Sequence, residues 1–170
     1  MPTDHSYLLR RISLGGEDGR RASLNLWLKA LKNGDTAEID RLADVLDAEW
    51  DKQEAAGQTN WSEHDRNTVV LITGETFSAT RRRAYREITP SQETMNLIVT
   101  GGDRGRVAFL SLFLKAAFAD DFERGRQLCN VILERIWTEQ DRAGSEYWPE
   151  EDRNLLRFMI QEIVQALDEQ

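Results

Sequence analysis

Two short segments of the chain combine one tryptophan, two carboxylates and one arginine at the same spacing. They are Trp61-Ser-Glu-His-Asp-Arg-Asn67 and Trp148-Pro-Glu-Glu-Asp-Arg-Asn154. A pair of carboxylates can act as general acid and general base when their surroundings separate their two pKa values. Ser62 and Pro149, however, are typical of the first residues of a helix, where the helix dipole stabilises ionised acids. We therefore favour a structural role for these carboxylates over a catalytic one.

The same two segments are candidates for binding another protein, because tryptophan and arginine are enriched at the energetic centres of interfaces. The candidate protein-binding residues are Trp61, Glu63, Asp65, Arg66, Trp148, Glu150, Asp152 and Arg153. An enzyme that uses Glu63 with Asp65, or Glu150 with Asp152, is the less favoured alternative. We assign no catalytic residue and expect a non-enzymatic protein that needs no cofactor.

A glycine-rich turn followed by an arginine also occurs twice, as Gly15-Gly-Glu-Asp-Gly-Arg20 and Gly101-Gly-Asp-Arg-Gly-Arg106. Backbone amides at a helix start can hold a phosphate, and the arginine would add a positive charge. The pattern lacks the Lys-Ser/Thr pair of a phosphate-binding P-loop, so a hinge before a helix is the favoured interpretation.

The densest basic patch of the sequence consists of Arg81, Arg82, Arg83 and Arg86. Such a patch suits an acidic protein or a phosphate backbone. The whole chain carries a net charge of −8 at pH 7, whereas nucleic-acid-binding domains are usually basic, so we favour a solvated helix end. With Arg20 and Arg106, these four residues are the candidate anion-binding residues.

Metal and thiol chemistry receive little support from the sequence. The two histidines, His5 and His64, and the single cysteine, Cys129, do not show the spacing of a zinc site. Cys129 falls on the apolar stripe of a predicted helix, which favours a buried thiol. One cysteine cannot form a disulfide within the chain, so we expect a reducing, cytoplasmic location. No signal-peptide pattern and no apolar stretch of membrane-spanning length is present, so no membrane partner is expected.

A longer similarity places these segments in two copies of one helical unit. Gly19-Arg-Arg-Ala-Ser-Leu-Asn-Leu-Trp-Leu-Lys-Ala30 resembles Gly105-Arg-Val-Ala-Phe-Leu-Ser-Leu-Phe-Leu-Lys-Ala116 at an offset of 86, and the tryptophan segments match at an offset of 87. We infer an internal duplication, with repeats at 1–89 and 90–170. The predicted fold is all-α: an internally duplicated helical bundle of two pseudo-equivalent three-helix units, packed into one globule with a shared core.

Apolar periodicity predicts the same helices in each copy. The first helix covers about 19–32 and 105–119, the second covers 36–55 and 121–143, and the third starts near Ser62 and Pro149. The first helix is apolar on nearly all sides, which is typical of a buried helix. The β-branched run 67–74 resembles a strand, but its match to the second copy predicts a helix. The lead segments 7–12 and 94–99 are compatible with either state, and we prefer helices because Ser91 is typical of a helix start.

The change of offset from 86 to 87 requires one inserted residue in the second copy. An insertion inside a helix would rotate everything after it by about 100°. We therefore expect the insertion after Ile136, near the end of the second helix. A pairing of Trp50 with Trp137 would then put the two indoles on different sides of their helices.

These observations favour a protein–protein interaction module, such as an adaptor, regulator or assembly factor. A duplicated Trp/Arg/acid surface suits a partner with twofold symmetry, and the negative net charge suits a partner with a basic surface. Nucleic-acid or nucleotide/phosphate binding through Arg81–Arg86 or the glycine-rich turns is the alternative.

Overall fold

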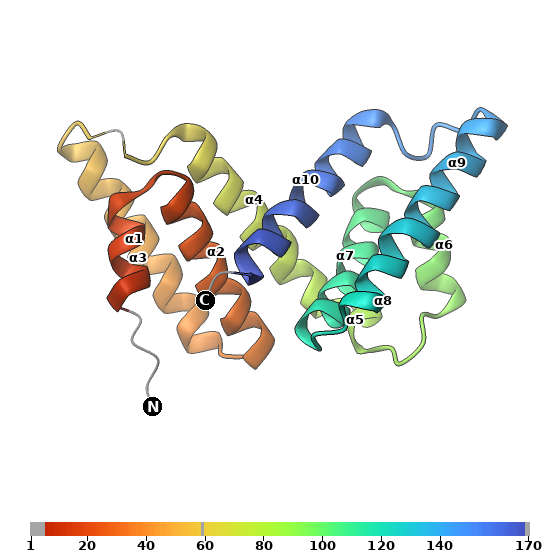
Figure 1. The fold of residues 1–170 in the computed structure, drawn as a ribbon, viewed down its shortest axis with the longest axis horizontal. Coiled ribbons are helices and arrows are strands. Elements are labelled where there is room, and N and C mark those ends of the chain that lie inside the picture. Colours follow the sequence, from red (N-terminus) through yellow and green to blue (C-terminus); the bar gives the residue numbers. More distant parts are fainter. Residues whose placement is uncertain (1–5, 59, 169–170) are drawn as a thin grey trace. The chain divides into compact units, whose positions relative to one another are not determined.

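The computed structural model describes residues 6–58 and 60–168, and every regular element in these ranges is a helix (Figure 1). The all-α class predicted from the sequence is confirmed. The elements are α1 (Ser6–Leu14), α2 (Gly16–Asn33), α3 (Thr36–Ala55), α4 (Glu63–Arg81), α5 (Arg83–Arg86), α6 (Gln92–Thr100), α7 (Gly102–Phe118), α8 (Phe122–Gln127), the π-helical segment η1 (Leu128–Leu133), α9 (Glu134–Ala143) and α10 (Glu150–Leu167). Within the same ranges, no helix combines the length and the apolar character needed to cross a membrane. His5 lies outside the described residues.

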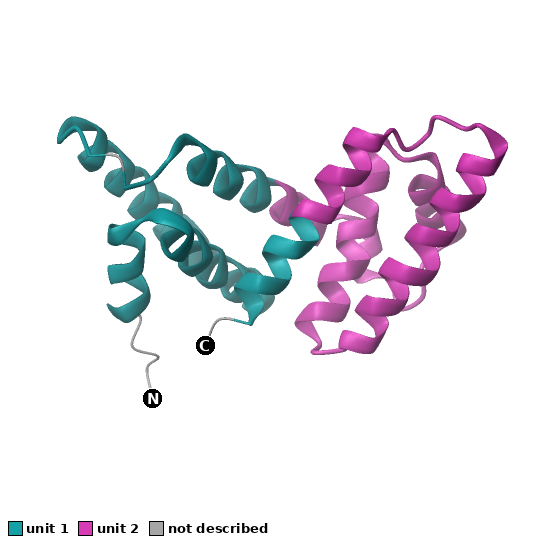
Figure 2. Cartoon of the chain, turned by 45° about the horizontal axis from the view of Figure 1, so that its top comes forward, with its two compact units in different colours: residues 1–74, 159–170 teal, residues 75–158 magenta. Residues whose placement is uncertain are grey.

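The helices divide into two compact units, which Figure 2 distinguishes by colour. Among the described residues, unit 1 contains the chain up to Gly74 and again from Met159, and unit 2 contains Glu75–Phe158. Both divisions fall inside long helices, so α4 and α10 each contribute one part to unit 1 and the other part to unit 2. Each unit therefore draws residues from both sequence segments, 1–89 and 90–170.

The leucine-rich helices α2 and α7 are the buried centres of their units. In α2 all residues from Ala22 to Leu28 are buried, and in α7 all residues from Gly105 to Leu114 are buried. A helix that is apolar on all sides must be covered on all sides, which confirms the helical interpretation of the repeated Leu-x-Leu-x-Leu pattern. The polar side chains inside are bonded: Asn25 donates to the carbonyl oxygen of Ala166 at 2.8 Å, and Ser111 donates to that of Ala79 at 2.7 Å.

Side-chain caps mark several helix starts. Asp35 accepts a hydrogen bond from the backbone N–H of Glu38, and Asp121 accepts one from Arg124, both at 3.0 Å. The Ser91 hydroxyl accepts from the N–H of Thr94, as expected of an N-cap. Both lead segments are helices, α1 and α6, and the β-branched run 67–74 lies within α4.

The π-helical segment η1 lies in the stretch of sequence where the offset between the similar segments changes from 86 to 87. In α3 the buried residues Leu42 and Leu46 are four positions apart, whereas the buried residues Leu128 and Leu133, at the two ends of η1, are five apart. A π-turn holds one more residue than an α-turn. The helix beyond η1 can therefore hold the extra residue and still turn the same side toward the core.

The position of Trp137, which follows η1, agrees with this orientation of the helix. The ring centroids of Trp137 and Trp148 are 5.4 Å apart, and those of Trp50 and Trp61 are also 5.4 Å apart. The prediction of an insertion after Ile136 assumed that a helix cannot absorb an extra residue, whereas η1, which precedes Ile136, holds one more residue than an α-helical turn.

Candidate functional site

The two tryptophans of the candidate segments, Trp61 and Trp148, belong to the interior. Each is only 2% exposed. The indole N–H of Trp61 donates to the carbonyl oxygen of Ile12 at 2.8 Å, and that of Trp148 donates to the carbonyl oxygen of Ile98 at 2.7 Å. Each indole therefore anchors the start of α4 or α10 to the end of α1 or α6. Both rings are therefore almost completely covered by the protein itself.

The glycine-rich turns pack directly against the same anchors. Gly15 has a φ of 72°, and a Cβ there would lie 2.6 Å from the carbonyl oxygen of Asn60, so no other residue fits. The N–H of Gly16 donates to this carbonyl at 2.9 Å. Gly101, with a φ of 76°, faces the carbonyl oxygen of Tyr147 in the same way. The amide of Gly16 is thus engaged within the protein instead of being open to an anion.

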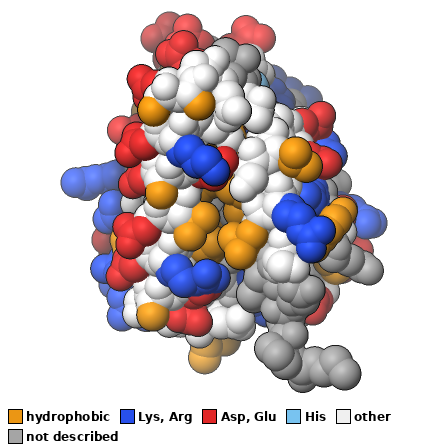
Figure 3. Space-filling model, turned by 90° about the vertical axis from the view of Figure 1, so that its left-hand side faces the viewer, with side chains coloured by type: hydrophobic (Ala, Val, Ile, Leu, Met, Phe, Trp, Pro, Cys, Tyr) orange, Lys and Arg blue, Asp and Glu red, His pale blue; other side chains and the backbone are white. Residues whose placement is uncertain are grey.

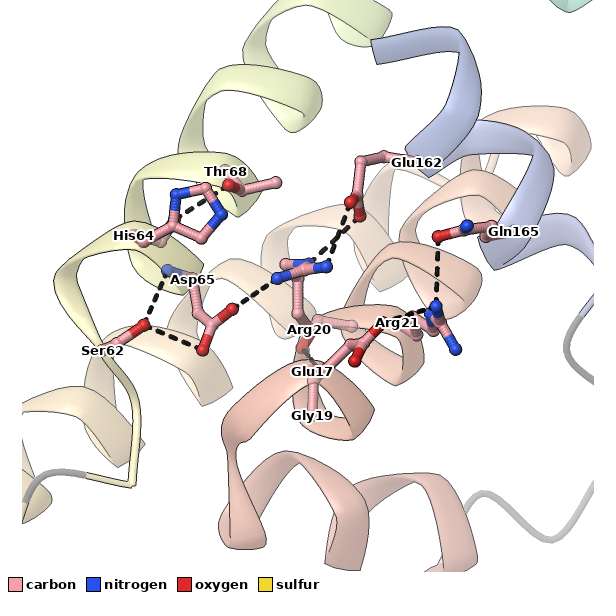
Figure 4. Close-up of polar contacts among 11 residues, drawn as sticks. Glu17, Gly19, Arg20, Arg21, Ser62, His64, Asp65, Thr68, Glu162 and Gln165 are labelled. Atoms are coloured by element: carbon pink, nitrogen blue, oxygen red, sulfur yellow. Dashed lines mark hydrogen bonds and ion pairs between the residues drawn. The ribbon is translucent and has the colours of Figure 1, made fainter. Parts of the chain in front are cut away.

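Arg20 lies buried between two carboxylates of unit 1 (Figure 4). Its Nη1 donates to Asp65 at 2.6 Å, and its Nε and Nη2 donate to the two oxygens of Glu162 at 3.1 and 3.0 Å. Burial alone would lower the pKa of Arg20, but the hydrogen bonds and charges of Asp65 and Glu162 outweigh it and raise the pKa. The second oxygen of Asp65 accepts from the hydroxyl of Ser62 at 2.9 Å. Arg20 is therefore committed to internal ion pairs.

Asp65 is buried although it lies in the first turn of α4. The sequence predicts both Glu63 and Asp65 at a helix start, and in the structure Asp65 is buried whereas Glu63 is exposed. The reason is Arg20, which draws the Asp65 carboxylate inward. Arg66 beside it is half-buried, with its guanidinium 5.9 Å from the ring centre of Trp50.

Arg106 makes the corresponding contacts in unit 2. Its Nε and Nη2 donate to Glu75 at 3.2 and 2.8 Å, and its Nη1 lies 3.1 Å from the exposed carboxylate of Asp103. Burial works against the charged form, but the hydrogen bond and charge of Glu75 outweigh it and raise the pKa of Arg106. Like Arg20, this arginine is occupied by protein carboxylates.

The acidic partners of these arginines, Glu75 and Glu162, were not among the residues predicted from the sequence. A signal was present, because these two glutamates are separated by the same 87 residues as Trp61 and Trp148. Nothing in the sequence, however, indicates that each glutamate pairs with an arginine of the opposite sequence half.

The second candidate segment lines a surface cleft of unit 2. The cleft has a volume of about 550 Å³, and its lining includes Trp148, Glu150, Arg153 and Arg157. Arg153 donates to both oxygens of Asp141 at 3.1 and 2.8 Å. This bidentate bond raises the pKa of Arg153 and lowers that of Asp141. Glu150 is exposed at the helix start and Asp152 is half-buried. The segment therefore presents fixed charges around a hollow.

An apolar groove adjoins this charged cleft. It has a volume of about 250 Å³ and is lined mainly by Val99, Ile136, Ala143 and Tyr147. Ser145 lines both hollows. Val99 is 39% exposed and Tyr147 is 55% exposed. None of these apolar residues was a candidate from the sequence, because Val99 and Ile136 lie within apolar stretches of helices, where apolar residues are expected to be buried.

The four arginines of the basic patch are all exposed in unit 2. Arg81 stacks over the ring of Phe77 at 4.1 Å and ends α4, whereas Arg86 donates to the carbonyl oxygen of Arg81. Arg83 lies 3.5 Å from Glu93. Together with Arg104, Arg82 and Arg83 line a further cavity of about 270 Å³.

The single thiol is shielded. Cys129 is half-buried in η1, and desolvation together with the charge of Glu134 raises its pKa to about 11. A thiol is nucleophilic only as thiolate, so the raised pKa lowers the reactivity of Cys129 near neutral pH. In the described part of the chain, no group of three or more histidine, cysteine or acidic side chains is placed to hold a metal ion.

Charges of both signs are mixed on the surface. On the face of unit 1 that Figure 3 shows, acidic and basic side chains stand next to one another without a continuous area of either sign. Such a face provides no concentrated field for a polyanion.

The sequence matches no protein-family model, and neither a curated protein nor a solved structure matches the chain.

Proposed function

We propose that this protein is a non-enzymatic interaction module that binds one partner protein at the end of unit 2 where α9, α10 and their connecting loop meet. The observation that carries this proposal is the apolar groove of Val99, Ile136 and Tyr147 next to the charged cleft of Glu150 and Arg153. Interfaces combine an apolar centre with a polar rim in this manner. Asp65 is already paired with Arg20, which leaves the Glu63/Asp65 pair without a free second carboxylate for acid–base work.

We further propose that the two sequence segments 1–89 and 90–170 are copies of one another. Contacts recurring at offsets of 86 and 87 support this: Trp61 to Ile12 matches Trp148 to Ile98, and Gln53 to Ser13 matches Gln140 to Val99. The ion pair of Arg20 with Glu162 matches that of Arg106 with Glu75 in the same way, because the two arginines are 86 residues apart and the two glutamates are 87 residues apart.

The duplication supplies an internal comparison for the groove. The positions equivalent to Val99, Ile136 and Tyr147 are Ser13, Glu49 and Asn60, which are polar. Because unit 1 forms the same tryptophan anchor with these polar residues, the fold does not require apolar side chains there. Apolar side chains that are exposed and unnecessary for folding favour a binding role. The proposed surface is thus present once, so it suits a single partner site and not a twofold one.

The charges around the groove favour a basic partner. Glu146 and Glu150 carry negative charge in the adjoining cleft. The charges of Arg153 and Arg157 are offset by Asp141 and Glu134, and that of Glu139 in the groove is offset by Arg135. A partner segment with one apolar side chain flanked by lysine or arginine would complement this arrangement. The single shielded Cys129 is compatible with the cytoplasmic location that we propose for the module.

Site-specific photo-crosslinking in the native cell tests the proposal. A photoreactive phenylalanine analogue replaces Tyr147 in one variant and the exposed, equivalent Asn60 in a matched control. We expect one dominant crosslinked protein from position 147 and none in common from position 60. Crosslinks that are identical at both positions, or absent at 147, would contradict the proposal.

Binding of the purified partner provides the second measurement. Ile136→Glu and Val99→Ser introduce the residues that unit 1 carries, so they should weaken binding at least about tenfold without lowering the melting temperature. Unchanged affinity in both variants would show that the groove is not the interface.

A further inference from the structure

We propose that unit 2 also binds the phosphoryl group of a small phosphate monoester, in the cavity lined by Arg82, Arg83 and Arg104. The cavity has a volume of about 270 Å³ and lies among residues of α5, α6 and α7. It is distinct in its lining from the groove and the cleft described above. The proposal therefore does not depend on the interaction module.

The charge balance inside the cavity is positive, although the chain as a whole carries −8. Three arginines and two glutamates, Glu87 and Glu93, line it. Within the described ranges, neither Arg82 nor Arg104 forms an ion pair. Two of the three guanidinium groups are therefore available to a ligand.

Both carboxylates contact Arg83, at 3.9 Å for Glu87 and 3.5 Å for Glu93, and within the described ranges neither forms an ion pair with Arg82 or Arg104. Glu87 accepts hydrogen bonds from the hydroxyl of Thr94 at 2.8 Å and from the hydroxyl and backbone N–H of Ser91. These donors, with Thr94 the strongest, lower the pKa of Glu87 and hold its charge toward α6. Glu93 is exposed, and its contact with Arg83 at 3.5 Å is a surface ion pair of the kind that an incoming anion readily replaces.

The equivalent position in unit 1 shows that the fold does not need Arg104. At an offset of 86, Arg104 corresponds to Asp18 and Leu97 corresponds to Arg11. Arg11 and Asp18 form an ion pair at 3.2 Å. In unit 2 this internal pair is replaced by an apolar side chain and an arginine without a carboxylate partner. Leu97 and Arg104 both line the charged cavity.

The lining defines the class of ligand. Guanidinium groups bind phosphate oxygens in a bidentate manner and keep their charge at all relevant pH values. Ala84, Leu97 and Ala108 provide an apolar surface for a carbon skeleton. The volume is slightly below the ~300 Å³ at which pockets for drug-sized ligands begin. A phosphoryl group with a small organic part, such as a sugar phosphate, fits these limits.

Calorimetric titration of the full chain at low ionic strength tests the site with three probes: ribose 5-phosphate, inorganic phosphate and ribose. We expect saturable binding of ribose 5-phosphate, weaker binding of phosphate, and none of ribose. Arg104→Asp and Arg82→Gln should each weaken binding of ribose 5-phosphate at least about tenfold. Arg10→Gln changes an exposed arginine of unit 1 and should leave the affinity unchanged. Equal melting temperatures confirm that all variants are folded.

Three results would overturn the proposal. The first is no saturable binding of ribose 5-phosphate up to about 10 mM. The second is an equal loss of affinity in Arg10→Gln, which would indicate general attraction by surface charge. The third is binding of a single-stranded oligonucleotide or a phosphoserine peptide without binding of ribose 5-phosphate, which would assign the cavity to a macromolecular phosphate.

Discussion

Arg20 and Glu162 are 142 residues apart in the sequence, yet their side chains form a buried, bidentate ion pair in unit 1. Arg106 and Glu75 form the same pair in unit 2. In both cases the arginine comes from a central helix, α2 or α7, and the glutamate comes from α10 or α4, the two helices that the units share. The interior of each unit therefore depends on residues from the opposite half of the sequence.

Breaking the pair between Arg20 and Glu162 should destabilise the protein strongly. Arg20→Met leaves the Asp65 and Glu162 carboxylates buried without a counter-charge, and loss of one partner of a buried ion pair costs about 3–5 kcal/mol. Urea denaturation followed by circular dichroism measures this change. The control is Arg41→Met, which removes the surface pair with Glu38 and should cost less than about 1 kcal/mol. Equal costs for the two variants would show that the buried pair has no special weight.

The sharing of α4 and α10 leads to a prediction about cooperativity. Leu112 is buried in α7, and Leu112→Asp places an unpaired charge in the core of unit 2, at a cost above about 4 kcal/mol. The first part of α10 then loses its packing, and the continuation of the same helix carries Glu162 and Ile163 into unit 1. We expect both units to lose protection together in hydrogen–deuterium exchange.

The same hydrogen–deuterium exchange measurement would also reveal independent folding of the two units. If peptides of α2 and α3 stay protected while those of α7 exchange, the two units fold independently and the cooperative interpretation is wrong. Phe122→Asp, at a side chain that is 60% exposed, serves as the control and should leave protection in both units unchanged.

The π-helical segment predicts different effects for two matched deletions. Removal of Asn130 from η1 restores α-helical spacing between Leu128 and Leu133 and keeps Trp137 against Trp148, so stability should change by less than about 1 kcal/mol. Removal of the equivalent Asp44 from α3 rotates the rest of that helix by about 100°.

That rotation should be costly. It moves Leu46 out of the core and separates Trp50 from Trp61, with an expected loss of about 3 kcal/mol or more. Thermal unfolding of the two deletion variants measures the difference. Similar melting temperatures would mean that η1 does not compensate for the additional residue.

The sequence was sufficient for the local structure and insufficient for the long-range pairing. Apolar periodicity predicts α2, α3 and α7 to within a few residues, because each pattern depends on neighbours within one or two turns. It does not predict that Arg20 meets Glu162 instead of an anion, since that pair depends on how distant helices pack.

The candidate site shows the same limit. The segment from Trp148 to Arg153 does line a surface cleft, but its indole turns inward because the N–H finds a carbonyl acceptor at Ile98. The exposed apolar side chain is the neighbour, Tyr147. The π-helix was missed for a different reason: none of its residues is glycine or proline, so the sequence contains no local sign of the altered hydrogen bonding.

Cys129 provides a prediction about pH. Its pKa of about 11, raised mainly by desolvation, leaves about 0.1% thiolate at pH 8, compared with about 10% for a thiol at the ordinary value of 9.0. Reaction with a disulfide reagent at pH 8 should therefore be about a hundredfold slower in the folded protein than in urea.

Because ionisation of Cys129 is disfavoured only in the folded state, the stabilising contribution of the neutral thiol is complete below pH 9 and is lost as the pH rises toward 11. Cys129→Ser should show less loss of stability over this pH range than the wild type, and an equal loss in both would contradict the assignment to this thiol.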